Sequence, residues 1–353
     1  MSLLEEDRCK LCGACKNSCP AGIKPNEMIR FYKLHDYVNL AKSMYDTNPF
    51  ALTCGNICQA PCMNDCIFNK VNTPINIKKI QNICAHDFGK YLPKMNTSNK
   101  IKGKCAVVGA GISGLTTAWY LNKHNYIVDV FEKSDKVGGE INLIPSNRLK
   151  YSDFKYDCDM ILRQQNINIF LNTIFDINLE NNYDHIFYCC GCEPKRLHII
   201  NDELACTYVN YLSETEHNEN IAIIGGGNVA LDCTLVNKGN STIFIRRNLW
   251  NMKIDKKDFE YLNNNKIRVI SNFIPTHLLR ESNNKFAICG NMDNNNIRIS
   301  NFDKIIYAIG KEQIIPNTKK GIIIKSSNTV VETVGNTVKQ LKEYFQKKAL
   351  QIK

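Results

Sequence analysis

The chain has 353 residues, 44% of them hydrophobic, and a formal net charge of +11 at pH 7. This length allows two or three domains with real cores, and no apolar stretch approaches the roughly 18 residues of a membrane span, so we expect no membrane partner. The positive charge is spread along the chain without a basic stripe interleaved with aromatic residues, so we expect no nucleic-acid partner either.

The first feature along the chain is a run of four cysteines, Cys9, Cys12, Cys15 and Cys19, followed by Pro20. Its spacing, C-x2-C-x2-C-x3-C-P, is the bacterial ferredoxin pattern, in which the first three thiolates hold one [4Fe–4S] cluster and the fourth holds another. The sequence therefore predicts two clusters, and a protein with two such clusters moves electrons one at a time.

A second group, Cys54, Cys58, Cys62 and Cys66, has one cysteine every four residues. A zinc site or a disulfide framework is the alternative to further iron–sulfur ligands. Zinc ribbons favour C-x2-C pairs, which are absent from this group. The first residues show neither the basic start nor the apolar segment of a secretory signal, so 17 cysteines predict a reducing, cytoplasmic location.

Residues 1–97 are predicted to form a small helical domain around these cysteines. Apolar residues at near-helical spacing from Met28 to Met44 predict one helix packed on the clusters. The polar stretch Asn96–Lys100 is predicted to be a linker.

A strand–glycine–helix pattern follows the linker. An apolar strand runs into Gly109, Gly111 and Gly114, a helix extends to about Lys123, and a second strand ends at Glu132. Together these features make a dinucleotide-binding fingerprint, in which the glycines admit a pyrophosphate to the helix N-terminus and the acid accepts from ribose hydroxyls. The alternative is an ordinary βαβ unit.

The pattern repeats about 116 residues later, with Gly225, Gly227 and Ala230 in the turn and helix. Its second strand ends in Arg246 and Arg247, where the first copy has an acid. Arginine at this position accepts a 2′-phosphate, so the residues favour NADP over NAD; a solvated strand end is the alternative. Two dinucleotide modules suggest one tightly held flavin and one exchanging nicotinamide.

Two stretches, 183–191 and 302–310, each join an acid, an apolar strand and a glycine, and are predicted to be the strands that cross between the nucleotide domains. The predicted fold is α/β, with a helical iron–sulfur domain followed by two Rossmann-like domains, the second inserted in the first. The predicted boundaries are 1–97 for the cluster domain, 98–195 with 309–353 for the FAD domain, and 196–308 for the NAD(P)H domain.

Over nearly its whole length the chain resembles the electron-input subunit of bacterial dihydropyrimidine dehydrogenase, and it is similar to the small subunit of NADPH-dependent glutamate synthase. The segments 48–58 and 74–81 carry this resemblance beside the motifs above. It implies that one cluster is held by Cys9, Cys12, Cys15 and Cys66, and the other by Cys19, Cys58, Cys62 and Gln81. Cys54 is left outside both sets, and Gln81 favours the dihydropyrimidine branch because the glutamate synthase branch usually has Glu there.

The resemblance also implies FAD at the first glycine motif and NADPH, or NADH, at the second. Electrons would pass from NADPH through the flavin and the clusters to a catalytic partner subunit in a heteromer, with no catalytic acid–base residue in this chain. The implied cofactor-binding residues are Gly109, Gly111, Ser113, Gly114, Glu132, Lys133, Gly138, Gly139, Arg148, Gly225, Gly227, Asn228, Val229, Arg246, Arg247 and Gly310.

One element of that family is missing. Its last strand ends in an Ala-Gly-Asp element whose Asp contacts the flavin, whereas here Gly321–Asn328 leads directly into the helical stretch from Thr329. A flavin-poor relay or scaffold is therefore one alternative function. A disulfide reductase is another, although Cys189, Cys190 and Cys192 lack the C-x-x-C spacing of a redox pair.

Overall fold

The computed structural model describes residues 7–94, 100–214, 217–252, 254, 256–318 and 320–351. The chain divides into two compact units: Met1–Asn142 with Ser146–Gly191 and Gln313–Lys353, and Leu143–Pro145 with Cys192–Glu312. The cysteine-rich part and the first glycine motif thus share unit 1, and the second motif lies in unit 2. The predicted domain boundaries stay a prediction, and the predicted linker lies, except for Lys100, outside the described residues.

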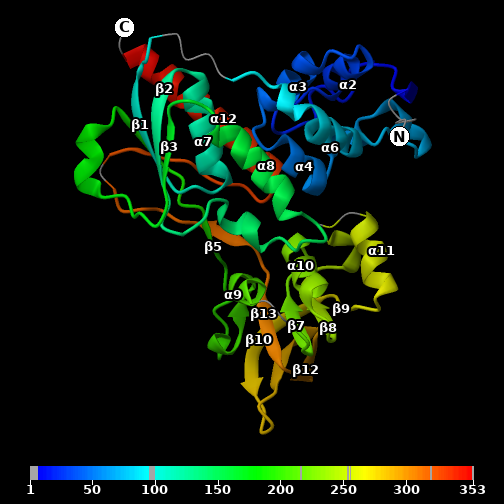
Figure 1. Ribbon diagram of the computed structural model, residues 1–353. Helices are drawn as coiled ribbons and strands as arrows, with labels where there is room; N and C mark the ends of the chain where they lie inside the picture. The colour runs from blue at the N-terminus through cyan, green and yellow to red at the C-terminus, as the bar shows by residue number, and fades with distance from the viewer. Residues whose placement is uncertain are drawn as a thin grey trace. The chain divides into compact units, whose positions relative to one another are not determined.

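The cysteine-rich part is helical (Figure 1). Pro25 occupies the first turn of the helix Pro25–Lys33, where a missing N–H costs nothing. At the start of the helix Ile77–Phe88, the Asn76 side chain accepts from Lys79 N and caps the helix. Its elements are α2 (Pro25–Lys33), α3 (Tyr37–Tyr45), α4 (Ala51–Ile57), α5 (Pro61–Asn64), η1 (Ile67–Val71), α6 (Ile77–Phe88) and η2 (Gly89–Tyr91).

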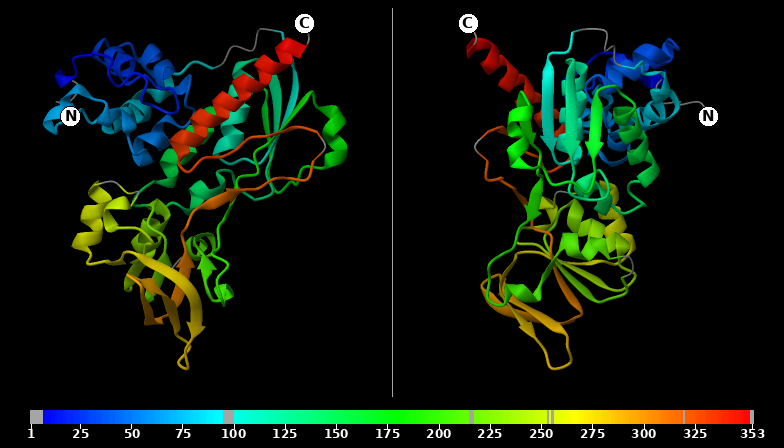
Figure 2. Two further views of the ribbon diagram at one scale, coloured as in Figure 1. Left: turned by 180° about the vertical axis from the view of Figure 1, so that it is seen from behind. Right: turned by 60° about the vertical axis from the view of Figure 1, so that its left-hand side comes forward.

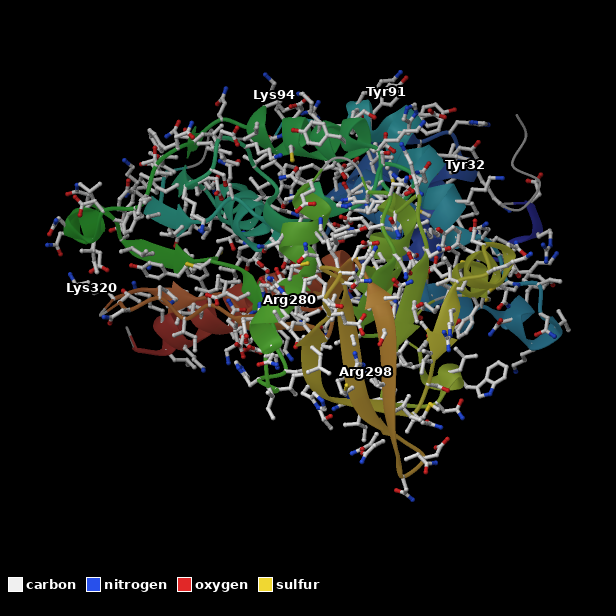
Figure 3. The ribbon with its side chains drawn as sticks, turned by 90° about the horizontal axis from the view of Figure 1, so that it is seen from below. Tyr32, Tyr91, Lys94, Arg280, Arg298 and Lys320 are labelled. Atoms are coloured by element: carbon white, nitrogen blue, oxygen red, sulfur yellow. The ribbon has the colours of Figure 1, made fainter. Side chains whose placement is uncertain are left out.

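The prediction of one helix from Met28 to Met44 was wrong, because the chain breaks between α2 and α3. His35 has φ +54°, a left-handed conformation that ends the first helix. The Asp36 side chain then accepts from Asn39 N at 3.2 Å and caps the second. Tyr37 stacks on Phe88 with ring centroids 4.3 Å apart, beside Tyr91, which Figure 3 labels and which is 44% exposed.

The first nucleotide-binding sheet has five parallel strands in the order β15-β4-β1-β2-β3. The helices α7 and α12 lie side by side and pack on it, α7 on β1 and β2 and the aromatic end of α12 on β4 (Figures 1 and 2). Its elements are β1 (Gly103–Val108), α7 (Ile112–Lys123), β2 (Tyr126–Phe131), η3 (Gly139–Leu143), α8 (Tyr151–Leu162), β3 (Ile167–Phe170), η4 (Ile177–Asn182), β4 (His185–Tyr188), β15 (Ile322–Ile323) and α12 (Val330–Gln351).

Unit 2 contains a second parallel sheet in the order β6-β13-β7-β8-β9 and an antiparallel sheet of β10, β11 and β12. Residues Ile221–Ile224 are buried throughout, as expected of a parallel strand covered on both faces. On the antiparallel sheet, Arg298, labelled in Figure 3, pairs with Glu281 at 2.6 Å. The elements are β6 (Cys206–Thr207), α9 (Tyr208–Ser213), β7 (Ile221–Ile224), α10 (Asn228–Val236), β8 (Ser241–Phe244), η6 (Leu249–Asn251), α11 (Lys256–Asn264), β9 (Arg268–Ile270), β10 (Phe273–Arg280), β11 (Phe286–Met292), β12 (Asn295–Phe302) and β13 (Lys304–Tyr307), with η5 (Asp202–Leu204) before them.

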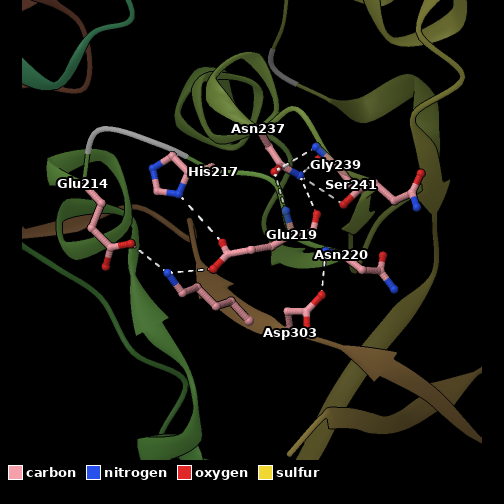
Figure 4. Close-up of polar contacts among 10 residues, drawn as sticks. Glu214, His217, Glu219, Asn220, Asn237, Gly239, Ser241 and Asp303 are labelled. Carbon is pink, nitrogen blue, oxygen red and sulfur yellow. Dashed lines mark hydrogen bonds and ion pairs between the residues drawn. The ribbon is translucent and has the colours of Figure 1, made fainter.

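A polar network lies at the end of the second parallel sheet where β7 and β13 begin (Figure 4). Lys304 Nζ lies 2.7 Å from Glu214 Oε2 and 3.0 Å from Glu219 Oε1. Asp303 Oδ2 accepts from Asn220 N at 2.9 Å, which ties the starts of the two strands together. These contacts lie at the opposite end of the strands from the glycine turn. They stabilise the sheet and do not belong to the candidate nucleotide site.

The prediction that stretches 183–191 and 302–310 cross between the nucleotide domains was wrong in detail. Their strands, β4 and β13, belong to the two parallel sheets. The crossing segments follow them directly: β5 (Cys192–Pro194) and β14 (Lys311–Gln313) pair in a two-stranded sheet of their own. The α/β class with one Rossmann-like domain inserted in another is confirmed. No helix of the described ranges has both the length and the apolar character needed to span a bilayer.

A buried carboxylate joins the cysteine-rich part to the first nucleotide-binding sheet. Asp157, on α8, is fully buried and accepts from Leu52 N at 3.3 Å and Thr53 N at 2.7 Å, at the start of α4. It also accepts from Tyr45 Oη at 2.9 Å. Burial raises the pKa of Asp157 to about 7, although these hydrogen bonds oppose the rise.

We expect Asp157→Ala to lower the free energy of unfolding by about 2–4 kcal/mol, because three buried donors lose their acceptor. Asp157 holds its proton in the folded state up to about pH 7. Its contribution is therefore present at low pH and is lost as the pH rises through that value, and the variant should lack this pH dependence. Urea unfolding of iron-loaded protein across this pH range measures both effects.

The matched control is Asp159→Ala on the same helix, since Asp159 is exposed and only pairs with Lys155. It should change the unfolding free energy by about 0.5 kcal/mol or less. Equal losses for the two variants would contradict the role assigned to Asp157.

Candidate functional site

The structure brings one set of four cysteines together. Cys9, Cys12 and Cys15 lie in the loop before α2, and Cys66 precedes η1. Burial raises the pKa of the Cys15 thiol to about 11, and the charges of Cys9, Cys66 and Cys12 act in the same direction, so these four thiols lie near one another.

A second set lines a cavity that encloses about 390 Å³ of empty space, part of it open to solvent. Gln81 also lines this cavity, and its Nε2 donates to Ala51 O at 2.8 Å. Ala60 N donates to Cys58 Sγ at 3.2 Å, a contact that favours a thiolate. The cysteines of the lining are Cys19, Cys54, Cys58 and Cys62.

The donors in the two sets fit iron–sulfur cubes. All 17 cysteines lie within the described ranges and are free thiols, which excludes a disulfide framework in this structure. In those ranges no three His, Cys, Asp or Glu side chains converge closely enough to hold a single metal ion. A cube spreads its four thiolates over four separate irons, so it needs a wider arrangement than zinc does.

The first turns of α12 lie against the second set. A Cβ on Gly335 would stand 1.9 Å from Pro20 O, so only glycine allows the helix to touch the loop that follows Cys19. Val331 lines the cavity itself. Just before the helix, Ser326 Oγ lies 3.0 Å from Ser113 Oγ in the first turn of α7. The segment from Ser326 to Gly335 therefore connects the first glycine motif with the cysteine cavity.

The glycines of the first motif fall into two kinds. A Cβ on Gly109 would meet Cys189 O at 2.4 Å, and one on Gly114 would meet Gly109 O at 1.8 Å, so the fold itself requires these two. Gly111 has φ −73° and its nearest neighbour would be Gly138 O at 4.0 Å. The fold does not need glycine at position 111, which leaves an open cradle at the N-terminus of α7 that a Cβ would fill.

Glu132 lies beside this cradle and is buried. Its Oε2 accepts from Ala110 N at 2.7 Å, and its Oε1 accepts from Ser134 N at 3.0 Å, which fixes the carboxylate against the glycine turn. Gly138 N donates to Ala110 O at 2.8 Å, and Gly139 follows it with φ +59°, so the predicted second glycine pair also borders the turn. The other predicted residues of this motif are the buried Ser113, the exposed Lys133 and the half-buried Arg148.

The second motif repeats this geometry in unit 2. A Cβ on Gly225 would meet Ala308 O at 2.1 Å, whereas one on Gly227 would meet nothing within 4 Å. Ala230, in the third glycine position, is fully buried against the sheet. Position 227 is thus the open cradle of the second motif.

The remaining predicted residues of the second motif differ in exposure. Arg246 and Arg247 are exposed just beyond β8. Asn228 and Val229 begin α10 and are half-buried, and Gly310 is exposed with φ +103°. Two exposed guanidinium groups at a strand end can donate hydrogen bonds to a phosphate.

Sequence reasoning missed the part that α12 plays. A glycine in the middle of a helix is a signal of close backbone approach, so Gly335 could have indicated a contact, but its partner Pro20 is remote in sequence. Asp157 was also missed, although it lies three residues after Phe154 and four before Ile161, a spacing that puts it on the apolar face of α8 and could have marked it as buried.

The cysteines considered for a disulfide reductase do not form a reactive pair. Cys189 is buried, and burial raises the pKa of its thiol to about 12. Burial also raises the pKa of Cys190. Reactive cysteines need a lowered pKa and access to solvent, so this arrangement does not support thiol chemistry.

Comparison with protein families places matches on the two halves of unit 1. Residues 1–91 match the family of dihydropyrimidine dehydrogenase domain II with its 4Fe–4S cluster. Residues 107–162 match an NAD(P)-binding Rossmann-like domain, which here covers the first glycine motif.

Known proteins similar to this chain are oxidoreductase subunits. The chain is 24% identical to the NAD-dependent dihydropyrimidine dehydrogenase subunit PreT homolog of Salmonella typhi, over 94% of this chain and 84% of that one. It is 26% identical to the NADPH-Fe(3+) oxidoreductase subunit beta of Geobacter sulfurreducens, over 91% of this chain and 54% of that one. The small chain of NADPH glutamate synthase from Bacillus subtilis is 27% identical over 53% of this chain and 43% of its own length.

Solved structures show the same fold at lower identity. A 2-naphthoyl-CoA reductase complex has a TM-score of 0.58 at 17% identity, covering 75% of this chain but only 44% of its own. Thioredoxin reductase of Lactococcus lactis has a TM-score of 0.53 at 16% identity, covering 69% of this chain and 98% of its own. These comparisons confirm the predicted resemblance: the chain is similar over nearly its whole length to dihydropyrimidine dehydrogenase subunits, and over about half of it to the small chain of glutamate synthase.

Proposed function

We propose that the chain takes electrons from NADPH at the second glycine motif and passes them, through FAD at the first motif and two [4Fe–4S] clusters, to a catalytic partner subunit. The observation that carries this proposal is the segment Ser326–Gly335, which touches both the first motif and the loop after Cys19. When bound, flavin and clusters supply the conversion of a hydride into single electrons.

The residues of the chain bind the cofactors, orient them and shield them from water. The open cradle at Gly111 admits a pyrophosphate to the N-terminus of α7, and Glu132, held by Ala110 N, is placed to accept from a ribose. Ser326 contributes a hydroxyl beside Ser113 where the family's Gly-Asp element is missing. An otherwise complete cradle favours FAD binding over the flavin-poor relay.

The proposed ligand sets are Cys9, Cys12, Cys15 and Cys66 for one cluster, and Cys19, Cys58, Cys62 and Gln81 for the other. Burial raises the pKa of the Cys62 thiol to about 12, so loading the second cluster releases protons. Relatives named as subunits or small chains support a partner that holds the substrate site. The names of those relatives divide between NAD and NADPH, so our choice of NADPH rests on the two arginines.

The test is anaerobic purification with flavin and iron counts, followed by titration with NADPH. We expect about eight irons and one FAD per chain, and bleaching of the visible spectrum by NADPH. Eight irons without flavin would support a relay instead, and fewer than two clusters would contradict the proposed ligand sets.

Two glycine variants separate folding from nucleotide binding. Compared without flavin, Gly111→Ala should unfold like the wild type, within about 0.5 kcal/mol, because its Cβ meets no protein atom closer than 4.0 Å, yet it should fail to retain FAD because that Cβ fills the cradle. Gly114→Ala should destabilise the fold by about 3 kcal/mol, because its Cβ meets the Gly109 carbonyl at 1.8 Å. The measurements are chemical unfolding and flavin released per chain, and full flavin content in Gly111→Ala would count against this site.

The arginine pair should set the preference for the nicotinamide. Arg246→Ser is expected to raise KM for NADPH about tenfold, equal to about 1.4 kcal/mol, and to leave KM for NADH nearly unchanged. Dye reduction with each cofactor measures this, and Lys238→Ser, an exposed cation in the same unit, is the control. A rise in KM of the same size for both cofactors would show that the Arg246 side chain does not bind a 2′-phosphate.

A further inference from the structure

The cavity proposed to hold the second cluster contains one donor more than a cube requires. A [4Fe–4S] cluster takes four protein ligands. Apart from Asn48, whose Oδ1 accepts from Phe50 N at 3.0 Å, five side chains that could bind iron line this cavity: Cys19, Cys54, Cys58, Cys62 and Gln81. The inference below rests on the proposed function, and it concerns the surplus donor, Cys54.

The helix α4 places Cys54 and Cys58 on one face. They are four residues apart, and Cys58 N donates to Cys54 O at 2.9 Å, so the helical hydrogen bonding continues to the second cysteine. Cys54 is 1% exposed, so its sulfur reaches solvent only through the cavity, part of which is open. Burial raises the pKa of Cys54 well above its ordinary value; the charge of Cys58 adds to this rise, a hydrogen bond with the Asn48 side chain opposes it, and the charge of Cys19 adds a smaller part. The three thiols therefore lie near one another around the cavity.

Gln81 and Cys54 are held next to each other by a close helix contact. A Cβ on Gly55 would stand 2.8 Å from Asn82 Cα, so α4 and α6 approach to backbone distance at the neighbours of these two residues. The Gln81 amide nitrogen is committed to Ala51 O at 2.8 Å. The Gln81 Oε1 atom is therefore the one available to iron. The Cys54 thiol lies on the neighbouring helix, α4.

The two donors differ in strength and charge. An amide oxygen is a neutral, hard ligand, whereas a thiolate is a soft, anionic one that iron–sulfur clusters prefer. Once the amide oxygen leaves, a thiolate within the same cavity is the strongest donor available for the fourth iron.

We propose that Cys54 is a reserve ligand of the second cluster and binds its fourth iron whenever the Gln81 oxygen is displaced or removed. In this exchange the Fe–O bond to Gln81 breaks and an Fe–S bond to Cys54 forms, while the thiol proton passes to solvent. No electron is transferred, and the cluster with its ligands gains one unit of negative charge. Because added negative charge opposes reduction, the cluster's midpoint potential falls.

The test compares variants by iron count and by electron paramagnetic resonance (EPR) of both the oxidised and the reduced protein in a redox titration. Gln81→Ala should keep about eight irons, as in the wild type, with the second cluster at a more negative midpoint potential. Cys54→Ser alone should leave the iron count and both potentials unchanged. The double variant Cys54→Ser/Gln81→Ala should lose iron from the second cluster only, to about seven with a three-iron EPR signal or to about four with complete loss.

The matched control is Cys84→Ser/Gln81→Ala. Cys84 is a fully buried thiol on α6 that does not line the cavity, so this variant should behave as Gln81→Ala does. The first cluster serves as an internal standard, and circular dichroism monitors folding.

Two results would overturn the reserve role while leaving the proposed function intact. One is a Gln81→Ala protein that loses as much iron as the double variant, and the other is a double variant indistinguishable from Gln81→Ala. A wild type with only one cluster would instead contradict the proposed function, and the inference with it.

Discussion

The structure of unit 1 depends on how the cysteine-rich helices are fixed to the first nucleotide-binding sheet, and two contacts do this. The buried Asp157 carboxylate binds the start of α4, the helix that carries Cys54 and ends at Cys58. Gly335 lets α12 touch Pro20, next to Cys19. Both contacts act on segments that hold predicted ligands of the same cluster. An electron relay needs fixed separations between its carriers, and these contacts fix the protein on both sides of the cavity.

The two nucleotide motifs use their glycines in the same two ways. In each, the first glycine is required by a neighbouring carbonyl, at Cys189 or Ala308, whereas the glycine before the helix faces open space. The first kind would be needed in any tight βα turn, but the second has a purpose only when another group occupies the cradle. The difference lies in the surroundings of each glycine, and the motif letters alone do not show it.

The sequence predicted most of the local structure and missed most of the long-range contacts. The glycine turns, their flanking strands and the helix to Lys123 follow from periodicity and turn chemistry, which are local. The break at His35 was missed because the apolar spacing of α2 and α3 happens to continue across it, while the Asp36 cap decides the outcome. The crossing strands were placed one element too early, since β4 and β5 are separated only by a short turn at Gly191. Grouping of the cysteines came from spacing and resemblance, whereas their packing against α12 depends on a residue more than 300 positions away.

The ligand chemistry of the second cavity follows from the same packing. The cavity is bounded by Val331 and by apolar residues of the cysteine-rich part, so charge within it is poorly screened. Under these conditions each additional thiolate makes a cluster harder to reduce, and a neutral amide ligand keeps its potential higher than four thiolates would. Lys78, which lines the cavity, and Glu332, at the start of α12, place opposite charges near Cys58. A thiol kept protonated by burial beside the proposed cluster adds no charge until a proton leaves, so Cys54 can stay in the cavity without lowering the potential that a Gln81 ligand would set.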